Sequence, residues 1–157
     1  MPTSYATLAE LAGHVGQHLG TSDWVEVDQA RIDAFAAATG DHQWIHVDAE
    51  RAKAGPFGTT IAHGFLTLSL LPMLFDTGFG IANVKMGVNY GLNRVRFTSP
   101  VPAGSRLRAH FRLLAFEPLP TPPGAGLGAQ LTVEATIERE GASKPACIAD
   151  TVSRRYT

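Results

Sequence analysis

Apolar and polar residues alternate along the second half of the chain. Residues 106–113 and 131–138 each carry an apolar side chain at every second position, with polar or charged side chains between them. A period of two predicts antiparallel strands with one face buried and the other in water. A third run, 84–97, changes its apolar parity near Gly91, which predicts a β-bulge there. A last strand is expected over 146–156.

The segment from Ala62 to Phe75 is apolar on every side of a helical projection. Such a helix is buried all round, and Pro72 is expected to end or kink it near Leu71. A central helix followed by antiparallel strands is an α+β arrangement. One sheet cannot enclose the helix completely, so a second copy of the chain is expected to cover it, and a homodimer follows.

The first third of the chain predicts shorter elements. Residues 5–19 carry apolar side chains at helical spacing and predict a helix, and 24–27 predicts a short strand. Asp28 is a candidate N-cap for a helix that ends at Gly40. Asp48 is expected to cap a further helical turn.

Composition restricts the function classes. The 157 residues fit one domain covering 1–157, and 45% hydrophobic with 17% charged residues is ordinary for a soluble globular protein. With 13 basic and 14 acidic residues, no nucleic-acid partner is expected. The longest apolar run is shorter than the roughly 20 residues that cross a bilayer, so no membrane partner is expected either.

The N-terminus shows no secretory signal, and the single cysteine, Cys147, predicts a buried thiol in a reducing cytoplasm. The Pro- and Gly-rich stretch 118–128 predicts a surface loop.

Candidate chemistry gathers on two short segments. Asp41 follows a helix C-terminus, where the negative end of the helix dipole disfavours a carboxylate charge, and this suits a group that moves protons. His46 lies five positions later, so both side chains can reach one water molecule. His63 and Gly64 open the apolar helix, whose first N–H groups are donors for an oxyanion. Asp41 as a turn residue and Gly64 as a close-packing residue are the alternatives.

Other kinds of site are weakly supported. The spacing of Asp41, His42, His46 and His63 matches no zinc pattern, so no metal is expected. The chain contains no nucleophile elbow, phosphate loop or dinucleotide fingerprint. Arginines on the polar strand faces are mostly solvated. Because arginine suits phosphate binding, one or two of them are candidates for holding coenzyme A phosphates, and Arg94 and Arg96 are the ones selected.

Two motifs resemble the MaoC-like (R)-specific enoyl-CoA hydratases, and more closely their NodN-like subgroup. They are Thr-Gly-Asp-His-Gln-Trp-Ile-His at 39–46 and Ile-Ala-His-Gly-Phe-Leu-Thr at 61–67, and 88–105 resembles the strand and turn that come next. The resemblance extends from about residue 20 to the end. It implies a hot-dog fold, an antiparallel sheet wrapped around a long helix, that dimerises. It also implies reversible hydration of trans-2-enoyl-CoA to (R)-3-hydroxyacyl-CoA, with the coenzyme A thioester as substrate and no cofactor.

The resemblance also assigns residues. By position, Asp41 and His46 correspond to the catalytic pair and the Gly64 amide to the thioester oxyanion donor, with His63 beside it in the substrate site. Many members have Asn-Pro where this chain has Gln43 and Trp44, which makes Trp44 a candidate wall of the pocket. A serine on the central helix of some members, which assists the acidic residue, falls at Pro72. Asn89 and Asn93 are its candidate replacements.

Two rival functions use the same fold. An acyl-CoA thioesterase of this architecture usually carries its acid on the central helix or the partner strand, and no Asp or Glu occurs from His63 to Phe75. A non-catalytic subunit that only binds acyl chains or stabilises a hydratase partner would lack the acid–histidine pair, which this chain keeps.

Overall fold

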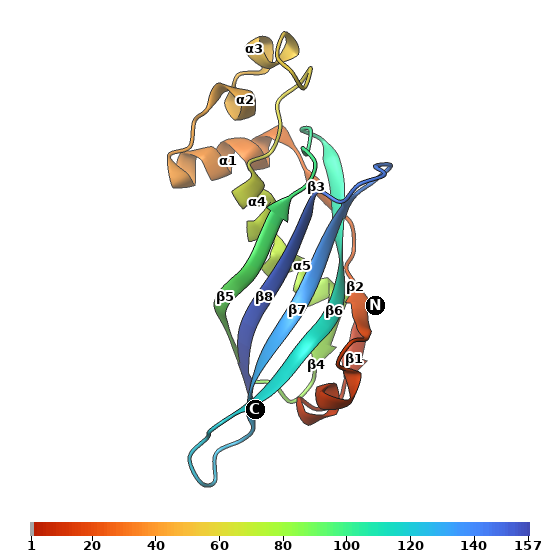
Figure 1. The fold of residues 1–157 in the computed structure, drawn as a ribbon. Helices are drawn as coiled ribbons and strands as arrows, with labels where there is room; N and C mark the ends of the chain where they lie inside the picture. Colours follow the sequence, from red (N-terminus) through yellow and green to blue (C-terminus); the bar gives the residue numbers. More distant parts are fainter. Residues whose placement is uncertain (1) are drawn as a thin grey trace.

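The computed structural model describes residues 2–157 and is built on one long antiparallel sheet (Figure 1). The strand order is β2–β6–β7–β8–β5, and β3 also pairs with β6. A separate parallel pair joins β1 to β4. The strands are β1 Thr3–Tyr5, β2 His18–Thr21, β3 Val25–Val27, β4 Phe79–Ile81, β5 Met86–Phe97, β6 Ser105–Leu119, β7 Gly128–Arg139 and β8 Cys147–Tyr156.

Helices lie in two places relative to this sheet. The helices α4 (Gly64–Ser69) and α5 (Leu71–Gly78) lie behind it, whereas α1, α2 and α3 lie beyond one of its ends (Figure 1). The latter span Gln29–Thr39, Trp44–Val47 and Ala49–Lys53, and a 3-10 helix spans Ala9–His14. No helix within residues 2–157 is long and apolar enough to cross a membrane.

The central helix is confirmed. Its interruption was predicted near Leu71 from the presence of Pro72, and it lies one residue earlier. Leu70 separates α4 from α5, and Pro72 lies in the first turn of α5, where its missing N–H costs no hydrogen bond. The helix also continues beyond the predicted end at Phe75. It therefore includes one acidic residue, Asp76, which lies just beyond the acid-free range from His63 to Phe75.

The helix predicted over 5–19 is wrong. The segment contains the end of β1, the short 3-10 helix and the beginning of β2. Gly16 has φ +85°, which interrupts a helix, and the Tyr5 hydroxyl donates to the carbonyl of Leu19 at 3.1 Å. The two ends of this segment pair as strands, β1 with β4 and β2 with β6, instead of forming a helix. Both partners are distant in sequence, so the local apolar spacing does not reveal this pairing.

The other local predictions are confirmed. The Asp28 side chain accepts from the N–H of Arg31 at 2.8 Å, and Gly40 ends α1 with φ +79°. Asp48 caps α3 by accepting from the N–H of Arg51 at 3.0 Å. The register of β5 against β8 shifts between Asn89 and Gly91, as the change of apolar parity predicted.

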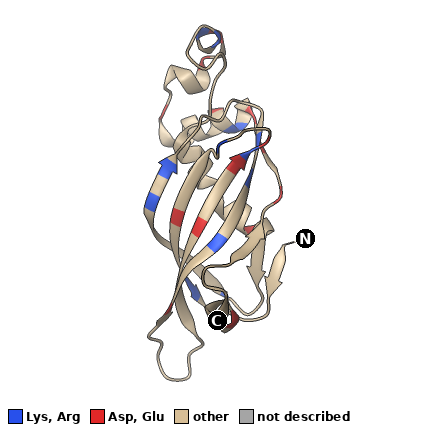
Figure 2. Cartoon of the chain, turned by 45° about the vertical axis from the view of Figure 1, so that its right-hand side comes forward, with Lys and Arg blue, Asp and Glu red and all other residues tan. Residues whose placement is uncertain are grey.

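The two faces of the sheet differ as the period of two predicted. On the inner face, packed on α4 and α5, Phe111 is fully buried and stacks on Phe75 with ring centroids 4.3 Å apart. Residues of both charge signs are spread across the strands (Figure 2). On the outer face, Arg106, Arg108, His110 and Arg112 of β6 form ion pairs with Glu134 and Glu138 of β7 and with Glu140, which directly follows β7.

Candidate active site

Three side chains predicted from the sequence meet where the helices α1–α3 join the sheet. The left-handed turn at Gly40 positions Asp41, the short helix α2 carries His46, and His63 is the residue before α4. One donor atom from each lies within 4.8 Å of the others. The His46 residue is 6% exposed and His63 2%, whereas the Asp41 side chain is 51% exposed. The arrangement joins two buried imidazoles to a carboxylate open to solvent.

The tautomer of His46 is set by a backbone carbonyl. Its Nδ1 lies 2.7 Å from the carbonyl oxygen of Ile61. Because a carbonyl only accepts, Nδ1 carries the hydrogen, and Nε2 is left to exchange a proton with a bound molecule. This arrangement suits general acid–base chemistry.

His63 joins the parts of the site to one another. Its Nε2 donates to the main-chain carbonyl of Asp41 at 2.9 Å, and its ring stacks on that of His46 with centroids 3.8 Å apart. The ring also packs against Phe35 of α1 at 5.0 Å. Its Nδ1 is buried without a hydrogen-bond partner among the described residues.

The Asp41 carboxylate is oriented by its own turn. Its Oδ1 accepts from the N–H of Gln43 at 3.3 Å, and its Oδ2 lies 4.0 Å from Nε2 of His63. The exposed part of the carboxylate is therefore free to accept a hydrogen bond from water or substrate. In residues 2–157, this cluster is also the group of donor atoms able to hold a metal ion, and His42 is not part of it.

Gly64 shows the close packing that was the alternative explanation for a glycine here. A Cβ added to Gly64 would lie 2.8 Å from the ring of Phe97, so any other residue would force this side chain to move. Gly64 also lines a cavity of about 340 Å³ together with Ile61, Thr67 and Phe97. Its N–H belongs to the first helical turn, where amides have no acceptor within the helix.

Other predicted site residues lie apart from this cluster. Asn89 lines a different cavity, together with Pro72, and none of the three clustered residues lines it. Asn93 lies at the second register shift of β5. Arg94 and Arg96 lie opposite Asp150 and Ile148 of β8, which places them on the outer face of the sheet.

Trp44 of α2 packs against residues that follow it closely in the sequence, in and after α3. The guanidinium of Arg51 lies 4.4 Å from the centroid of its ring, and a Cβ on Gly55 would come within 3.0 Å of the indole. Neither cavity is lined by Trp44. Phe97, which covers Gly64, and the two carbonyls that hold the histidines were not predicted from the sequence.

The chain is similar to known MaoC-like proteins over most of its length. A family model described as "MaoC like domain" matches residues 10–117. The 3-hydroxyacyl-thioester dehydratase Z of Mycobacterium tuberculosis is 53% identical over 151 residues, covering 96% of this chain and 97% of that protein. Nodulation protein N of Rhizobium leguminosarum bv. viciae is 48% identical over 152 residues, covering 94% and 89%.

A solved structure gives the same picture of the fold. The crystal structure of the MaoC-like dehydratase from Rhodospirillum rubrum has a TM-score of 0.76 and 24% identity, and the match covers 96% of each chain. The sheet wrapped around α4 and α5 is thus the hot-dog fold that the motifs implied.

Proposed function

Because this chain belongs to the MaoC-like dehydratase family, we propose that it hydrates trans-2-enoyl-CoA reversibly to (R)-3-hydroxyacyl-CoA. It is an enzyme of the dehydratase class. The main support for the proposed reaction is that Asp41 and His46 lie close together. Nδ1 of His46 is hydrogen-bonded to a carbonyl, so Nε2 is free to exchange a proton with the substrate. The name of the mycobacterial relative supports a hydroxyacyl-thioester substrate.

The proposed mechanism assigns one role to each group. The N–H of Gly64 polarises the thioester carbonyl, which makes C3 of the enoyl chain electrophilic. The Asp41 carboxylate takes a proton from water as the water oxygen bonds to C3, and protonated His46 delivers a proton from Nε2 to C2. Asp41 then returns its proton to solvent and His46 takes one up. These are acid–base steps alone, so we propose that the reaction uses no cofactor.

We also propose that the enzyme works as a homodimer. The outer long edge of β5 has no partner strand within residues 2–157, and the strand is exposed along nearly its whole length. It presents Met86, Val88, Tyr90 and Leu92 to solvent, and the neighbouring α4 presents Phe65, which is 68% exposed. A long apolar edge strand normally has a cover, and a second copy of the same edge supplies one. Sedimentation of the wild type should give a dimer, Val88→Lys should shift it toward monomer, and Ala125→Lys in the β6–β7 loop should not.

A cytoplasmic location is the accompanying proposal. Cys147 is a free, buried cysteine, and burial raises the pKa of its thiol to about 11. A thiol this hard to ionise does not react readily, in line with a structural role in a reducing compartment.

The decisive experiment follows the loss of enoyl-thioester absorbance with crotonyl-CoA and trans-2-octenoyl-CoA. Wild type should hydrate at least one substrate to the (R) product. Asp41→Asn should lose at least about 100-fold in kcat. Asp23→Asn, a change at another exposed aspartate, is the matched control and should match wild type. An (S) product, or full activity in Asp41→Asn, would overturn the assignment.

Thioester hydrolysis is the second candidate function, and the position of Asp76 supports it. Thioesterases of this architecture usually carry an acid on the central helix, and Asp76 is an exposed carboxylate on α5, one residue after the acid-free range that ends at Phe75. A thiol reagent in the same assay detects free coenzyme A. Release of coenzyme A that depends on Asp76 and not on Asp41 would favour the hydrolase.

A further inference from the structure

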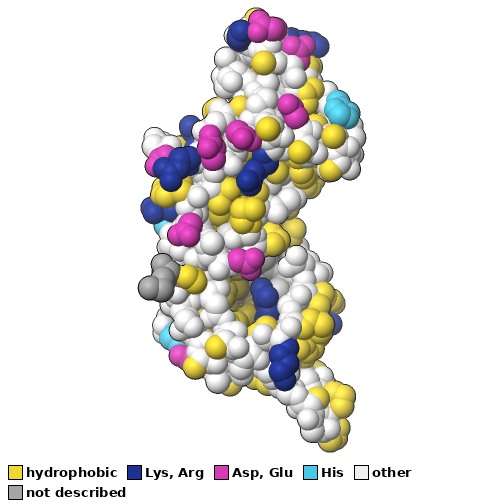
Figure 3. Space-filling model, turned by 180° about the vertical axis from the view of Figure 1, so that it is seen from behind, with side chains coloured by type: hydrophobic (Ala, Val, Ile, Leu, Met, Phe, Trp, Pro, Cys, Tyr) yellow, Lys and Arg dark blue, Asp and Glu magenta, His cyan; other side chains and the backbone are white. Residues whose placement is uncertain are grey.

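A second cavity, of about 410 Å³, lies between the helices α4–α5 and the strands β5 and β8. From behind, the surface is hollowed where a basic side chain lies among apolar ones (Figure 3). Leu68, Leu71, Phe75 and Leu92 form much of the cavity wall. Its volume is within the range of pockets that hold small organic ligands.

One end of the cavity wall is polar. Asn89 of β5 lies opposite Ser153 of β8, and in the next inward-facing pair Gly87 lies opposite Arg155. Cross-strand partners point to the same side of a sheet, and Asn89, Ser153 and Arg155 all line the cavity. An amide, a hydroxyl and a guanidinium therefore lie next to one another along this wall.

These three side chains are not committed to partners inside the protein. None of them makes a side-chain hydrogen bond or ion pair within residues 2–157, although Ser153 is only 8% exposed. By contrast, the hydroxyls of Thr151 and Ser69 on the same wall donate to backbone carbonyls at 2.9 and 2.6 Å. Ser153 is buried, Arg155 is half-buried and Asn89 is exposed, so the polar atoms of all three side chains are open to the cavity and available to a ligand.

Arg155 gives this end of the cavity its charge. It is the one charged residue in the cavity lining, and any side chain at Gly87 would collide with its guanidinium. Burial lowers the pKa of Arg155 and the nearby Asp76 carboxylate raises it, but a guanidinium stays charged at neutral pH. Asp76 forms no ion pair with it among the described residues. An anionic ligand would supply a direct ion-pair partner for Arg155.

We propose that this cavity binds an aliphatic carboxylate, with the carboxylate on Arg155, Ser153 and Asn89 and the chain on the apolar wall. Guanidinium and carboxylate match in geometry and charge, and the hydroxyl and amide add neutral donors. The carboxylate is either that of a free fatty acid or the far end of a dicarboxylic acyl thioester. The binding chemistry is the same in both cases, and it does not depend on the proposed reaction.

Calorimetric titration of the purified protein with octanoate and with octanol tests the site. Octanoate should bind more tightly than octanol, and Arg155→Gln should weaken octanoate roughly tenfold or more while leaving octanol unchanged. Arg154→Gln is the matched control, because Arg154 lies on the outer face, 3.7 Å from the Tyr90 ring centroid, and should bind octanoate like wild type. Ser153→Ala, a smaller change, should weaken octanoate less.

Absence of octanoate binding, equal affinity for octanoate and octanol, or unchanged octanoate affinity in a folded Arg155→Gln protein would each overturn the proposal. The comparison of octanoate and octanol affinity for the wild-type protein tests the proposal even if the Arg155 variant does not fold. Kinetics then separate the sources. If the far end of a substrate is bound, Arg155→Gln should lower kcat/KM for the ω-carboxylated analogue of trans-2-octenoyl-CoA and spare the plain substrate. If a free acid is bound, both substrates should respond alike.

Discussion

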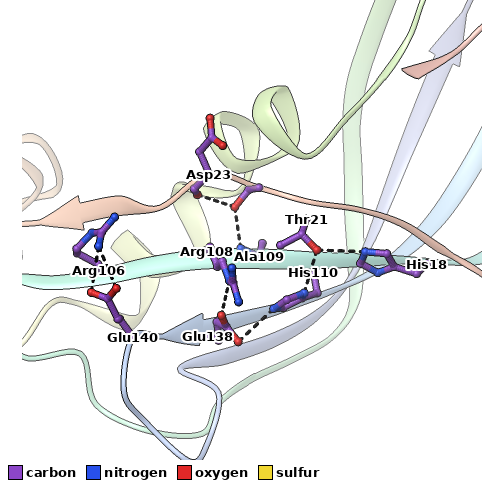
Figure 4. Close-up of polar contacts among 10 residues, drawn as sticks. His18, Thr21, Asp23, Arg106, Arg108, Ala109, His110, Glu138 and Glu140 are labelled. Atoms are coloured by element: carbon purple, nitrogen blue, oxygen red, sulfur yellow. Dashed lines mark hydrogen bonds and ion pairs between the residues drawn. The ribbon is translucent and has the colours of Figure 1, made fainter. Parts of the chain in front are cut away.

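Polar side chains on the outer face of the sheet and in the candidate active site are satisfied in different ways. On the outer face, the Thr21 hydroxyl lies 3.1 Å from ring nitrogens of both His18 and His110, and His110 pairs with Glu138, which also pairs with Arg108 (Figure 4). Both ring nitrogens of His110 are used. In the site, His46 and His63 each use one ring nitrogen on a backbone carbonyl and keep the other one free.

The difference separates structural polar groups from reactive ones. A histidine with both nitrogens paired to protein groups is fixed in place and has no lone pair or proton to offer a substrate. A histidine held through one nitrogen keeps the other for chemistry, and its orientation is still defined. The free ring nitrogens of His46 and His63 therefore distinguish the candidate site from the outer face, and the following substitutions test this difference.

Replacement of His46 by glutamine should have the largest effect. Glutamine can donate to the Ile61 carbonyl in place of Nδ1, but it cannot exchange a proton at neutral pH. We expect kcat for enoyl-CoA hydration to fall at least about 100-fold. His110→Gln on the outer face should leave kcat unchanged. Equal losses in the two variants would remove the distinction between the two regions.

Replacement of His63 by phenylalanine should have the next largest effect. The ring still stacks on His46, but the hydrogen bond to the Asp41 carbonyl is lost and the loop that carries the carboxylate loosens. A hydrogen bond of about 1 kcal/mol corresponds to a roughly five- to tenfold fall in kcat, with KM little changed.

The melting temperature of the same variant sharpens the test. Phenylalanine also removes the buried, unpartnered Nδ1, so stability should stay level or rise while kcat falls. His63→Gln keeps a donor and should recover part of the rate. A large fall in melting temperature, or no recovery with glutamine, would contradict a positioning role for His63.

The parts predicted correctly from the sequence are those fixed by local patterns. Alternation along 106–113 and 131–138 defines both faces of β6 and β7, and the caps at Asp28 and Gly40 depend on neighbouring residues alone. The segment 5–19 was predicted wrongly because its pairing partners, β4 and β6, are distant in sequence.

In the candidate site, too, the side chains could be predicted from local patterns but the contacts that orient them could not. Motif spacing identified Asp41, His46 and His63, but the contacts that fix both histidines come from the main-chain carbonyls of Ile61 and Asp41. A carbonyl is present at every residue, so the sequence carries no signal for its role. Asn89 was expected near Asp41, but the register of β5 against β8 places it in the other cavity, with Ser153.

Acid unfolding provides the smallest and most specific test of the outer face. Burial raises the pKa of Glu138, but hydrogen bonds from His110 and Arg108 and their charges lower it by more, so its folded pKa lies below the usual value. A lowered pKa stabilises the fold above the unfolded pKa, near about 4.3, and this stabilisation is lost as pH falls through the folded pKa.

Glu138→Gln should therefore lower the melting temperature slightly at pH 7 and have no effect well below pH 4. Glu138 is about one-third exposed, so the change at pH 7 should be small, at most that of a surface ion pair, about 1 kcal/mol or less. Glu50→Gln, which removes an exposed ion pair with Lys53, is the control and should change the melting temperature less than Glu138→Gln does. A Glu138 variant that destabilises the fold equally at pH 7 and at pH 3 would show that packing, rather than charge, holds this side chain. The enoyl-CoA hydration rate should stay the same in both variants, because neither carboxylate belongs to the Asp41 cluster.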